Sequence, residues 1–393
     1  MIMTNKVIPY GKQSISDDDI NAVIEVLKSD WLTQGPAVPA FESAIAEYCV
    51  ANYACATNSA TSALHIACLA LGVDKSDIVW TSPISFVASS NCALYCGASV
   101  DFVDIDLETG NMSVVALKKK LTIAKQNKRL PKVVIPVHLA GQSCDMEAIN
   151  ELAEEYGFKV IEDASHAIGA KYKNKPVGSC EYSDITVFSF HPVKIITSAE
   201  GGMAVTNCKA LDKKMKRLRS HGITNQPDEM TEPSHGPWYY QQIGLGFNYR
   251  MTELQAALGL SQLKQLDNFI SFRNQIAEYF DSYFTSQGLE PLKQRSDSYS
   301  SYHLYILKIN FETQQQQAQM VTQLRDQGVQ AHLHYIPIFL QPYYQELGFN
   351  KCDFSQSMQY YQQAMTIPLH PSLSSQDIEY IKQTVLKTHQ QLI

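Results

Sequence analysis

The sequence predicts an α/β fold in which a mostly parallel sheet is covered by helices on both faces. Short apolar runs rich in β-branched residues alternate with stretches of helical periodicity, a pattern typical of parallel sheets with helical crossovers. The expected strands are residues 53–57, 78–81, 100–103, 133–137, 159–162 and 185–190. With 393 residues, the chain is long enough for two domains. A hydrophobic content of 45% and a charged content of 18% can fill and cover a core, which excludes wholesale disorder.

Two helices are expected before the first of these strands. Ser16 begins one of them, because Asp19 lies three residues later, as in a capping box, and apolar residues then recur at helical spacing. Those residues are Ile20, Val23, Ile24 and Leu27. The second helix follows Pro39 and has on one side the apolar residues Phe41, Ile45 and Cys49. Residues 31–36 form a loop between the two helices, and this loop exposes Trp31.

Strands and helices then alternate along the first half of the chain. A helix over residues 61–71 follows the strand 53–57, and another runs from Asp145 as its N-cap to Gly157 as its C-cap. Ligands of such sheets bind beyond the carboxyl ends of the strands. The residues that follow each strand are therefore the candidates for chemistry.

The second half begins with a long loop and leads into a smaller domain. Residues 224–238 carry three prolines and no apolar period, which indicates a surface loop that is a functional lid or disordered. Thr252 caps a helix that runs through the 260s. A strand over 302–309, a helix over 313–327, a strand over 331–335 and C-terminal helices follow. We expect a large domain over residues 1–255 and a small α+β domain over residues 256–393.

Charge, cysteines and hydropathy exclude several classes of protein. A formal net charge of −7 argues against a protein that coats nucleic acid. No stretch approaches the roughly 20 apolar residues that span a bilayer, and the N-terminal residues do not form a signal peptide. The nine cysteines include no Cys-x-x-Cys pair and read as buried thiols in a reducing compartment. We therefore expect a cytoplasmic protein with no nucleic-acid or membrane partner.

Lys194 is the first candidate for chemistry. It ends the segment Ser-Phe-His-Pro-Val-Lys over residues 189–194, directly after a buried strand. A lysine in a sheltered site can have its pKa lowered and then form a Schiff base with a carbonyl. Taken alone, Lys194 reads more simply as a solvated surface charge.

Asp163 follows the strand 159–162 and gives a second candidate. A carboxylate at the floor of a pocket can pair with a pyridinium nitrogen and keep it protonated, as pyridoxal chemistry requires. Asp163 could equally cap a helix. Together with His166 it could suggest metal ligands, but two ligands at that spacing are weak evidence without a third.

Two further segments suit a phosphorylated aromatic ligand. Residues 58–62, which include Ser59, Ala60 and Thr61, join a strand to a helix, and free N–H groups at a helix N-terminus bind phosphate. Phe86 lies just past the strand 78–81, where its ring could stack on a planar ligand. Each has an ordinary alternative, a helix cap for the first segment and a core aromatic residue for the second.

Taken together, the chain resembles the DegT/DnrJ/EryC1/StrS family of sugar aminotransferases, which are pyridoxal-phosphate enzymes of fold type I. The resemblance runs nearly end to end and implies a large domain with a seven-stranded, mostly parallel sheet. The segments that carry it are residues 8–10, 31–36, 58–64, 162–167, 189–194, 219–222, 246–251 and 368–371.

The resemblance also implies roles for individual residues. Lys194 would be the catalytic Schiff-base lysine, and Asp163 would pair with the ring nitrogen of pyridoxal 5'-phosphate. Phe86 would stack on the ring, and His166 would lie near the ring face or its phenolic oxygen. Ser59, Ala60, Thr61 and Ser189 would bind the phosphate. Asn248 would reach the phosphate held by the neighbouring subunit of a homodimer with shared active sites.

For the substrates, the resemblance points to a UDP-linked keto-sugar and to L-glutamate as amino donor. The residues expected to contact them are Tyr10, Trp31, Leu32, Arg250, His334 and Tyr335. Trp31 could instead pack two helices together, and Arg250 could be a structural ion pair. His332 and His334 share one face of their strand, but no third metal ligand is evident, so no metal is expected.

Within the family, residues 189–194, 333–337 and 367–373 resemble most the enzymes of pseudaminic-acid biosynthesis. These aminate C4 of UDP-2-acetamido-2,6-dideoxy-β-L-arabino-hex-4-ulose. Residues 195–199 depart from that pattern where a proline after Lys194 and a glycine before Glu200 are expected. Other nucleotide-linked 4-keto-sugars, a pyridoxal-phosphate-binding regulator without turnover, and a Ser/His hydrolase remain as alternatives; the hydrolase lacks a Gly-x-Ser-x-Gly elbow.

Overall fold

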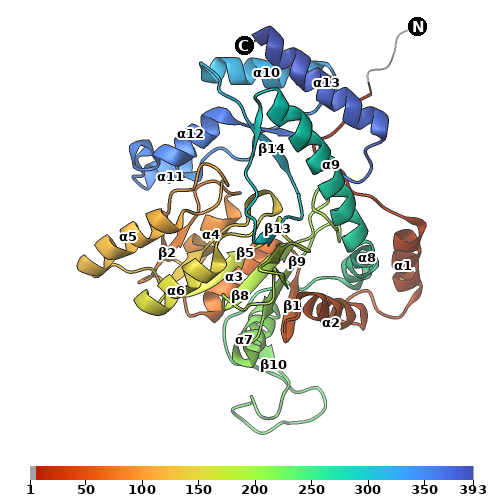
Figure 1. Cartoon of the computed structure of the whole chain (residues 1–393). Coiled ribbons are helices and arrows are strands. Elements are labelled where there is room, and N and C mark those ends of the chain that lie inside the picture. The colour runs from red at the N-terminus through yellow and green to blue at the C-terminus, as the bar shows by residue number, and fades with distance from the viewer. Residues whose placement is uncertain (1–5, 393) are drawn as a thin grey trace.

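The computed structural model describes residues 6–392 and is built on a seven-stranded sheet (Figure 1). The strand order is β1-β9-β8-β5-β4-β2-β3. β9 runs antiparallel to both its neighbours, and the other strands are parallel to one another, as the sequence predicts. The strands are β1 (Tyr53–Thr57), β2 (Ile78–Thr81), β3 (Ser99–Phe102), β4 (Val133–Ile135), β5 (Lys159–Asp163), β8 (Ile185–Ser189) and β9 (Gly202–Thr206).

Helices cover both faces of this sheet, which explains why its strands are apolar on both sides. Consecutive residues of β5 show the two faces: Ile161 packs in the core under α3 and α4, whereas Val160 packs in the core under α5 and α6. The helices around the sheet are α2 (Ala37–Cys49), α3 (Ala60–Ala70), α4 (Ala88–Tyr95), α5 (Val114–Gln126), α6 (Met146–Tyr156), α7 (Lys209–Arg219) and α8 (Glu253–Leu263). The same alternation sends Asp163 to the face of α3 and α4, and Glu162 to the opposite face.

The first helix, α1 (Asp17–Lys28), begins with the predicted capping box between Ser16 and Asp19. Its apolar side, however, is not buried in this chain: the exposed fractions of Ile20 and Leu27 are 50% and 58%. Asp19 is buried instead, and the side-chain amide of Gln262 donates to it at 2.7 Å. Helical periodicity therefore predicted the helix correctly but not what covers its apolar face.

The second helix begins at Ala37, three residues before the predicted start after Pro39. Proline is tolerated there because the N–H groups of the first turn have no partner within the helix. Glu253 of α8 supplies that partner, since its carboxylate accepts from the N–H groups of Ala37 and Val38 at 2.5 and 3.2 Å. The predicted buried side of α2, with Phe41 and Ile45, is confirmed.

A smaller antiparallel sheet, β12-β14-β15, forms the upper part of the molecule in Figure 1. It comprises β12 (Glu290–Pro291), β14 (Tyr305–Lys308) and β15 (Ala364–Ile367), with the helices α9 (Leu266–Ser286), α10 (Gln314–Asp326) and α13 (Ser375–Leu392) packed on it. The predicted helix through the 260s is in fact two helices, because α8 ends at Leu263 and α9 begins at Leu266. The division of the chain at residue 255 stays a prediction.

The predicted strand over residues 331–335 is wrong. His332 alone pairs with Thr366, by two backbone hydrogen bonds of 2.9 and 2.7 Å, and the ladder goes no further. The next polar side chain, His334, bonds instead to the Thr366 hydroxyl at 2.9 Å. The segment therefore lies beside β15 as an irregular loop, which frees its side chains to face the large sheet.

The remaining elements are short. They are β6 (Lys171–Tyr172), β7 (Lys175–Pro176), β10 (Ile223–Thr224), β11 (Gln241–Gln242), β13 (Ser298–Tyr299), α11 (Pro342–Glu346) and α12 (Ser355–Gln363). The predicted long loop is confirmed: it lies between β10 and β11 and extends away from the body of the molecule (Figure 1). Within residues 6–392, no helix combines the length and the apolar character needed to cross a membrane.

Candidate active site

A cavity of about 860 Å³ lies at the carboxyl ends of β1, β2, β4, β5 and β8. This is where ligands of parallel sheets bind. The irregular segment at residues 332–335 closes it from the side of the small sheet. Among the predicted site residues, the cavity is lined by Tyr10, Ser59, Ala60, Thr61, Phe86, Asp163, His166, Ser189, Lys194, His334 and Tyr335.

The turn between β1 and α3 offers hydrogen-bond donors to an anion. Ser59 is the N-cap of α3, and its hydroxyl accepts from the Ser62 N–H at 3.1 Å. The N–H groups of Ala60 and Thr61 make no hydrogen bond within the described part of the chain, as is usual for the first turn of a helix. An anion in the cavity would satisfy them and would also meet the positive end of the helix dipole.

Gly202 packs directly behind this turn. A Cβ atom at Gly202 would lie 2.5 Å from the Ala60 nitrogen and from the carbonyl carbon of Ser59. Only glycine allows β9 to approach the turn so closely, and the contact fixes the direction of the free N–H groups. In the sequence, Gly202 stands out only as the end of Glu200-Gly201-Gly202 downstream of Lys194, a pattern that by itself gives Gly202 no role at the phosphate turn.

Asp163 ends β5 with its side chain buried beside the cavity. Its Oδ1 accepts from the Ser165 N–H at 3.1 Å, and its Oδ2 accepts from the Ser89 hydroxyl at 2.6 Å. The carboxylate is therefore held by two donors while the residue still lines the cavity. Ser89, and Ser85 bonded to it, are site residues that the sequence analysis missed.

Lys194 lies in the turn that follows β8, where its backbone N–H donates to the His191 carbonyl at 2.9 Å. Its side chain lines the cavity and makes no hydrogen bond or ion pair with any other residue between positions 6 and 392. Burial lowers the pKa of Lys194 to about 8, and the negative charge of Asp163 partly offsets that effect. At pH 7 about a tenth of the amine is therefore neutral and nucleophilic, far more than for an ordinary lysine.

His166 and Tyr335 form a polar pair on another wall of the cavity. The Ala140 N–H donates to His166 Nδ1 at 3.3 Å, so the neutral ring carries its proton on Nε2 and donates it to the Tyr335 hydroxyl at 3.0 Å. Burial and the positive charge of Lys194 hold the pKa of His166 well below its usual range. His166 is thus a neutral donor.

Tyr10 and the histidines of the irregular segment extend that wall. The Tyr10 ring lies 4.9 Å from the ring of His334 and 5.4 Å from that of His332. His332 lines the cavity as well. Burial lowers the pKa of His334 to about 3, so this ring is neutral too. No group of three candidate metal ligands occurs among residues 6–392.

Phe86 and Ser189 complete the predicted residues of the cavity. Phe86 is 60% exposed although it is a large apolar side chain, and its ring lies 6.5 Å from that of Tyr335. An exposed ring at a cavity wall is available to stack on a planar ligand. Ser189, the last residue of β8, is 7% exposed and lines the same cavity.

Trp31, Leu32, Asn248 and Arg250 do not line this cavity. Trp31 and Leu32 are 55% and 50% exposed, although the Leu32 carbonyl accepts from the Glu253 N–H at 3.0 Å. Asn248 is exposed and pairs with Ser220 through an isolated bridge. Arg250 is half-buried and has no ion pair with another described residue, so its structural alternative finds no support within one chain.

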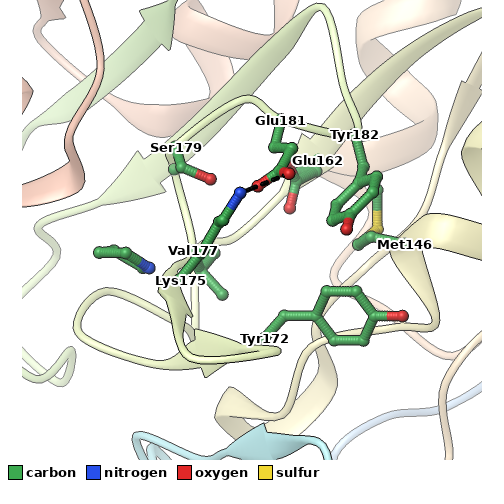
Figure 2. A pocket seen from close by; sticks show the side chains of 10 residues that line it. Met146, Glu162, Tyr172, Lys175, Val177, Ser179, Glu181 and Tyr182 are labelled. Atoms are coloured by element: carbon green, nitrogen blue, oxygen red, sulfur yellow. Dashed lines mark hydrogen bonds and ion pairs between the residues drawn. The ribbon is translucent and has the colours of Figure 1, made fainter.

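Glu162, next to Asp163, faces a separate hollow of about 20 Å³ on the other side of the sheet (Figure 2). That volume suits about one water molecule. Two of the residues that line it, Lys175 and Glu181, form the ion pair that Figure 2 draws as a dashed line. Glu162 itself bonds to His138 at 2.7 Å, and such hydrogen bonds hold its pKa below the usual range although burial raises it. The hollow is not a second ligand site.

The residues of the large cavity fit pyridoxal phosphate. Lys194 offers an amine with no other partner, Asp163 offers a fixed carboxylate, and the turn behind which Gly202 packs offers free N–H groups for a phosphate. These groups face one cavity that is large enough for the cofactor and a substrate.

Comparison with known proteins gives the same answer. The sequence model of the DegT/DnrJ/EryC1/StrS aminotransferase family matches residues 13–386. Spore coat polysaccharide biosynthesis protein SpsC of Bacillus subtilis is 37% identical over 385 residues, which cover 97% of each chain. UDP-4-amino-4,6-dideoxy-N-acetyl-beta-L-altrosamine transaminase of Campylobacter jejuni is 37% identical over 380 residues, or 96% of each chain.

Solved structures resemble the whole chain as well. Helicobacter pylori PseC, an aminotransferase involved in the biosynthesis of pseudoaminic acid, superposes with a TM-score of 0.89 at 33% identity, covering 98% of this chain and 100% of PseC. Spr1654 of Streptococcus pneumoniae in its PLP form has a TM-score of 0.89 at 28% identity, with coverage of 98% and 100%. The chain belongs to the DegT/DnrJ/EryC1/StrS aminotransferase family and is a pyridoxal-phosphate-dependent sugar aminotransferase of fold type I.

Proposed function

We propose that the enzyme transfers an amino group from L-glutamate to C4 of UDP-2-acetamido-2,6-dideoxy-β-L-arabino-hex-4-ulose. The product would be UDP-4-amino-4,6-dideoxy-N-acetyl-β-L-altrosamine, for pseudaminic-acid biosynthesis. The observation that carries a transamination is that Lys194, whose pKa is about 8, and Asp163 line the same cavity. The choice of sugar is supported by the printed function of the Campylobacter relative and by the similarity to PseC.

We propose that each group of residues in the cavity holds one part of the cofactor. Ser59, Ala60, Thr61 and Ser189 would bind the phosphate, Asp163 would bind the ring nitrogen, and Phe86 would stack on the ring. Pyridoxal phosphate, when bound, supplies an electron sink for the charge that develops on the donor carbon as its proton leaves. His166, a neutral ring held by Ala140 and Tyr335, would lie near the face of the cofactor ring or its phenolic oxygen.

Lys194 is the group that moves protons. Its Nζ would take the proton from Cα of L-glutamate in the first half-reaction and deliver a proton to C4 of the sugar in the second. A general base works best when its pKa lies near the working pH, and such a base contributes roughly 10²–10⁴-fold to the rate. The lowered pKa of Lys194 meets that condition, whereas an ordinary lysine would remain almost fully protonated.

The substrate would lie between the two sheets. Tyr10, His334 and Tyr335 line the cavity from the side of the small sheet, where neutral rings can contact a sugar without repelling a diphosphate. Their hydroxyl and imidazole groups suit sugar hydroxyls. Arg250 would bind the carboxylate of L-glutamate through both of its terminal nitrogens.

We further propose a cytoplasmic homodimer with shared active sites, in which Asn248, Trp31, Leu32 and Arg250 act on the cavity of the neighbouring subunit. Trp31, Leu32 and Asn248 are exposed on one chain, and none of the four residues lines its own cavity, which supports this arrangement. Mixing Lys194→Ala subunits with Asn248→Ala subunits tests it. If the sites are shared, heterodimers contain one intact site, and randomly mixed dimers should recover about a quarter of the wild-type activity. No recovery after verified subunit exchange would contradict the shared site.

The test of the reaction is the visible absorption spectrum of the purified enzyme before and after adding L-glutamate. A yellow band that glutamate bleaches, with 2-oxoglutarate formed in equal amount, would establish the donor. A panel of UDP-, GDP- and dTDP-linked 4-keto-sugars would then identify the acceptor, because relatives named GDP-perosamine synthase and UDP-4-amino-4-deoxy-L-arabinose–oxoglutarate aminotransferase are 34% and 30% identical. A yellow protein that no amino donor bleaches would favour a regulator.

A further inference from the structure

We propose that Ser85 and Ser89 are positioning residues that orient Asp163 toward the cofactor through a directed chain of hydrogen bonds. The inference rests on the proposed role of Asp163 as the partner of the ring nitrogen. Neither serine belongs to the groups assigned above to the phosphate, the ring face or the substrate. Ser85 lies on the segment that leads from β2 into α4, and Ser89 lies in the first turn of α4.

The chain is short, buried and continuous. The hydroxyl oxygens of Ser85 and Ser89 lie 2.7 Å apart, and the Ser89 hydroxyl lies 2.6 Å from Asp163 Oδ2. Ser89 is fully buried and Ser85 is 4% exposed, so water does not compete strongly for either hydroxyl. Ser85 also lines the active-site cavity, so the chain runs from the cavity wall to the carboxylate.

The available protons give the chain its direction. A carboxylate can only accept, so the single proton of the Ser89 hydroxyl points to Asp163. The Phe86 carbonyl is a competing acceptor, but it lies farther away, at 3.3 Å, and carries no full charge. Because its proton is committed, Ser89 can only accept from Ser85, whose hydroxyl must donate. The order is therefore Ser85 to Ser89 to Asp163.

Orientation is what Asp163 needs from these donors. The terminal torsion of an aspartate is broad, so the backbone and the rotamer alone do not fix the plane of its carboxylate. The Ser165 N–H holds Oδ1 and the Ser89 hydroxyl holds Oδ2, and two donors on different oxygens fix that plane. Without Ser89, the carboxylate could turn about the remaining hydrogen bond and lose its alignment with the ring nitrogen.

The same segment carries Phe86, which would stack on the ring. The backbone N–H of Ser89 donates a hydrogen bond to the Phe86 carbonyl at 3.3 Å. A backbone hydrogen bond thus links Phe86, which would contact the ring face, to Ser89, which orients the partner of the ring nitrogen. A neighbouring serine is organised differently: Ser90, also fully buried, pairs its hydroxyl with that of Tyr344 at 2.6 Å.

This contrast allows a matched experiment. The apo-forms of Ser89→Ala, Ser85→Ala and the control Ser90→Ala are titrated with pyridoxal phosphate and with its 1-deaza analogue, in which a C–H group replaces the ring nitrogen. Fluorescence gives the affinity for each ligand, and thermal unfolding of each apo-form verifies its fold. The quantity compared is the ratio of the two affinities, which cancels losses unrelated to the ring nitrogen.

We expect Ser89→Ala to weaken binding of pyridoxal phosphate by roughly tenfold or more, the factor for one hydrogen bond to a charged group, and to leave binding of the deaza analogue unchanged. Ser85→Ala should change the ratio in the same direction by a smaller factor, and it replaces Ser89→Ala if that variant does not fold. Ser90→Ala should keep the wild-type ratio. Equal losses for both ligands, or a wild-type ratio in both Ser89→Ala and Ser85→Ala, would overturn the proposal.

Asp163→Asn separates this proposal from the one on which it rests. If Asp163→Asn abolishes the preference for pyridoxal phosphate while the serine variants keep it, Asp163 binds the ring nitrogen without help from the serines, and the positioning role alone is wrong. If Asp163→Asn keeps the preference, the role of Asp163 is itself wrong, and the positioning role falls with it.

Discussion

Replacing Gly202 by alanine tests most directly how the turn before α3 is built. Gly202 pairs with Thr57 of β1 and with Ser189 of β8, so its strand is held from both sides. An added Cβ would lie 2.5 Å from the backbone of Ser59 and Ala60, whereas ordinary van der Waals contact begins at 3.4 Å. The atoms that it meets are backbone atoms, which cannot rotate away.

The structure sets the size of the effect. Relieving the overlap requires the turn or the strand to shift by about 0.9 Å, the difference between 3.4 and 2.5 Å. An extra methyl group forced into a packed site costs about 1–3 kcal/mol. If that cost falls on the turn, the N–H groups of Ala60 and Thr61 lose their alignment, and the affinity for pyridoxal phosphate falls by roughly 5- to 150-fold.

The assay is a titration of the apo-form of Gly202→Ala with pyridoxal phosphate, together with its unfolding in urea. Gly244→Ala is the matched control, because a Cβ at Gly244 meets nothing within 4 Å. We expect the control to bind the cofactor and to unfold like the wild type. If Gly202→Ala matched Gly244→Ala in both measurements, the contact between β9 and the turn would not shape the phosphate site, and the reasoning would be refuted.

Four other outcomes follow from the site and its supports. The rate at which the apoenzyme reacts with pyridoxal phosphate should rise with pH through about 8, because Lys194 loses its proton there, and should level off above that pH. A rate that still rises at pH 10 would indicate a lysine with the ordinary pKa of 10.5. Lys194→Ala should bind the cofactor without covalent linkage and should form no 2-oxoglutarate from L-glutamate, which absorbance and product analysis check. Tyr335→Phe removes the hydroxyl that accepts from His166 Nε2, and we expect kcat/KM to fall roughly 2- to 12-fold, the factor for one neutral hydrogen bond. An unchanged kcat/KM would show that His166 does not need the hydrogen bond to Tyr335. Arg273 is 1% exposed, and one of its terminal nitrogens donates to three backbone carbonyls at 2.8 to 3.3 Å. Arg273→Met should therefore lower the free energy of unfolding, measured in urea, by about 3 kcal/mol or more, and a loss below about 1 kcal/mol would contradict a stabilising role for these hydrogen bonds.

Much of the fold could be predicted because it depends on local pattern. The β-branched runs gave six of the seven strands of the large sheet to within a few residues, and the strand that they missed is β9. The capping residues Ser16 and Thr252 gave helix starts that the structure confirms. The predictions failed where a distant partner decides. Glu253 starts α2 earlier than Pro39 suggested, and one bridge to Thr366 is all that the expected strand over 331–335 forms.

The same division applies to the site. The sequence by itself determined which reactive groups stand at strand ends, Lys194 after β8 and Asp163 at the end of β5, because parallel strands present their carboxyl ends at one edge of the sheet. Only the tertiary structure decided how those groups are supported. The contacts from Gly202 to Ala60, from Ser89 to Asp163 and from Tyr335 to His166 each join residues far apart in the chain. A periodic pattern records which face of an element is buried, but not which distant side chain packs against it, because that choice is made when the whole chain closes around its core.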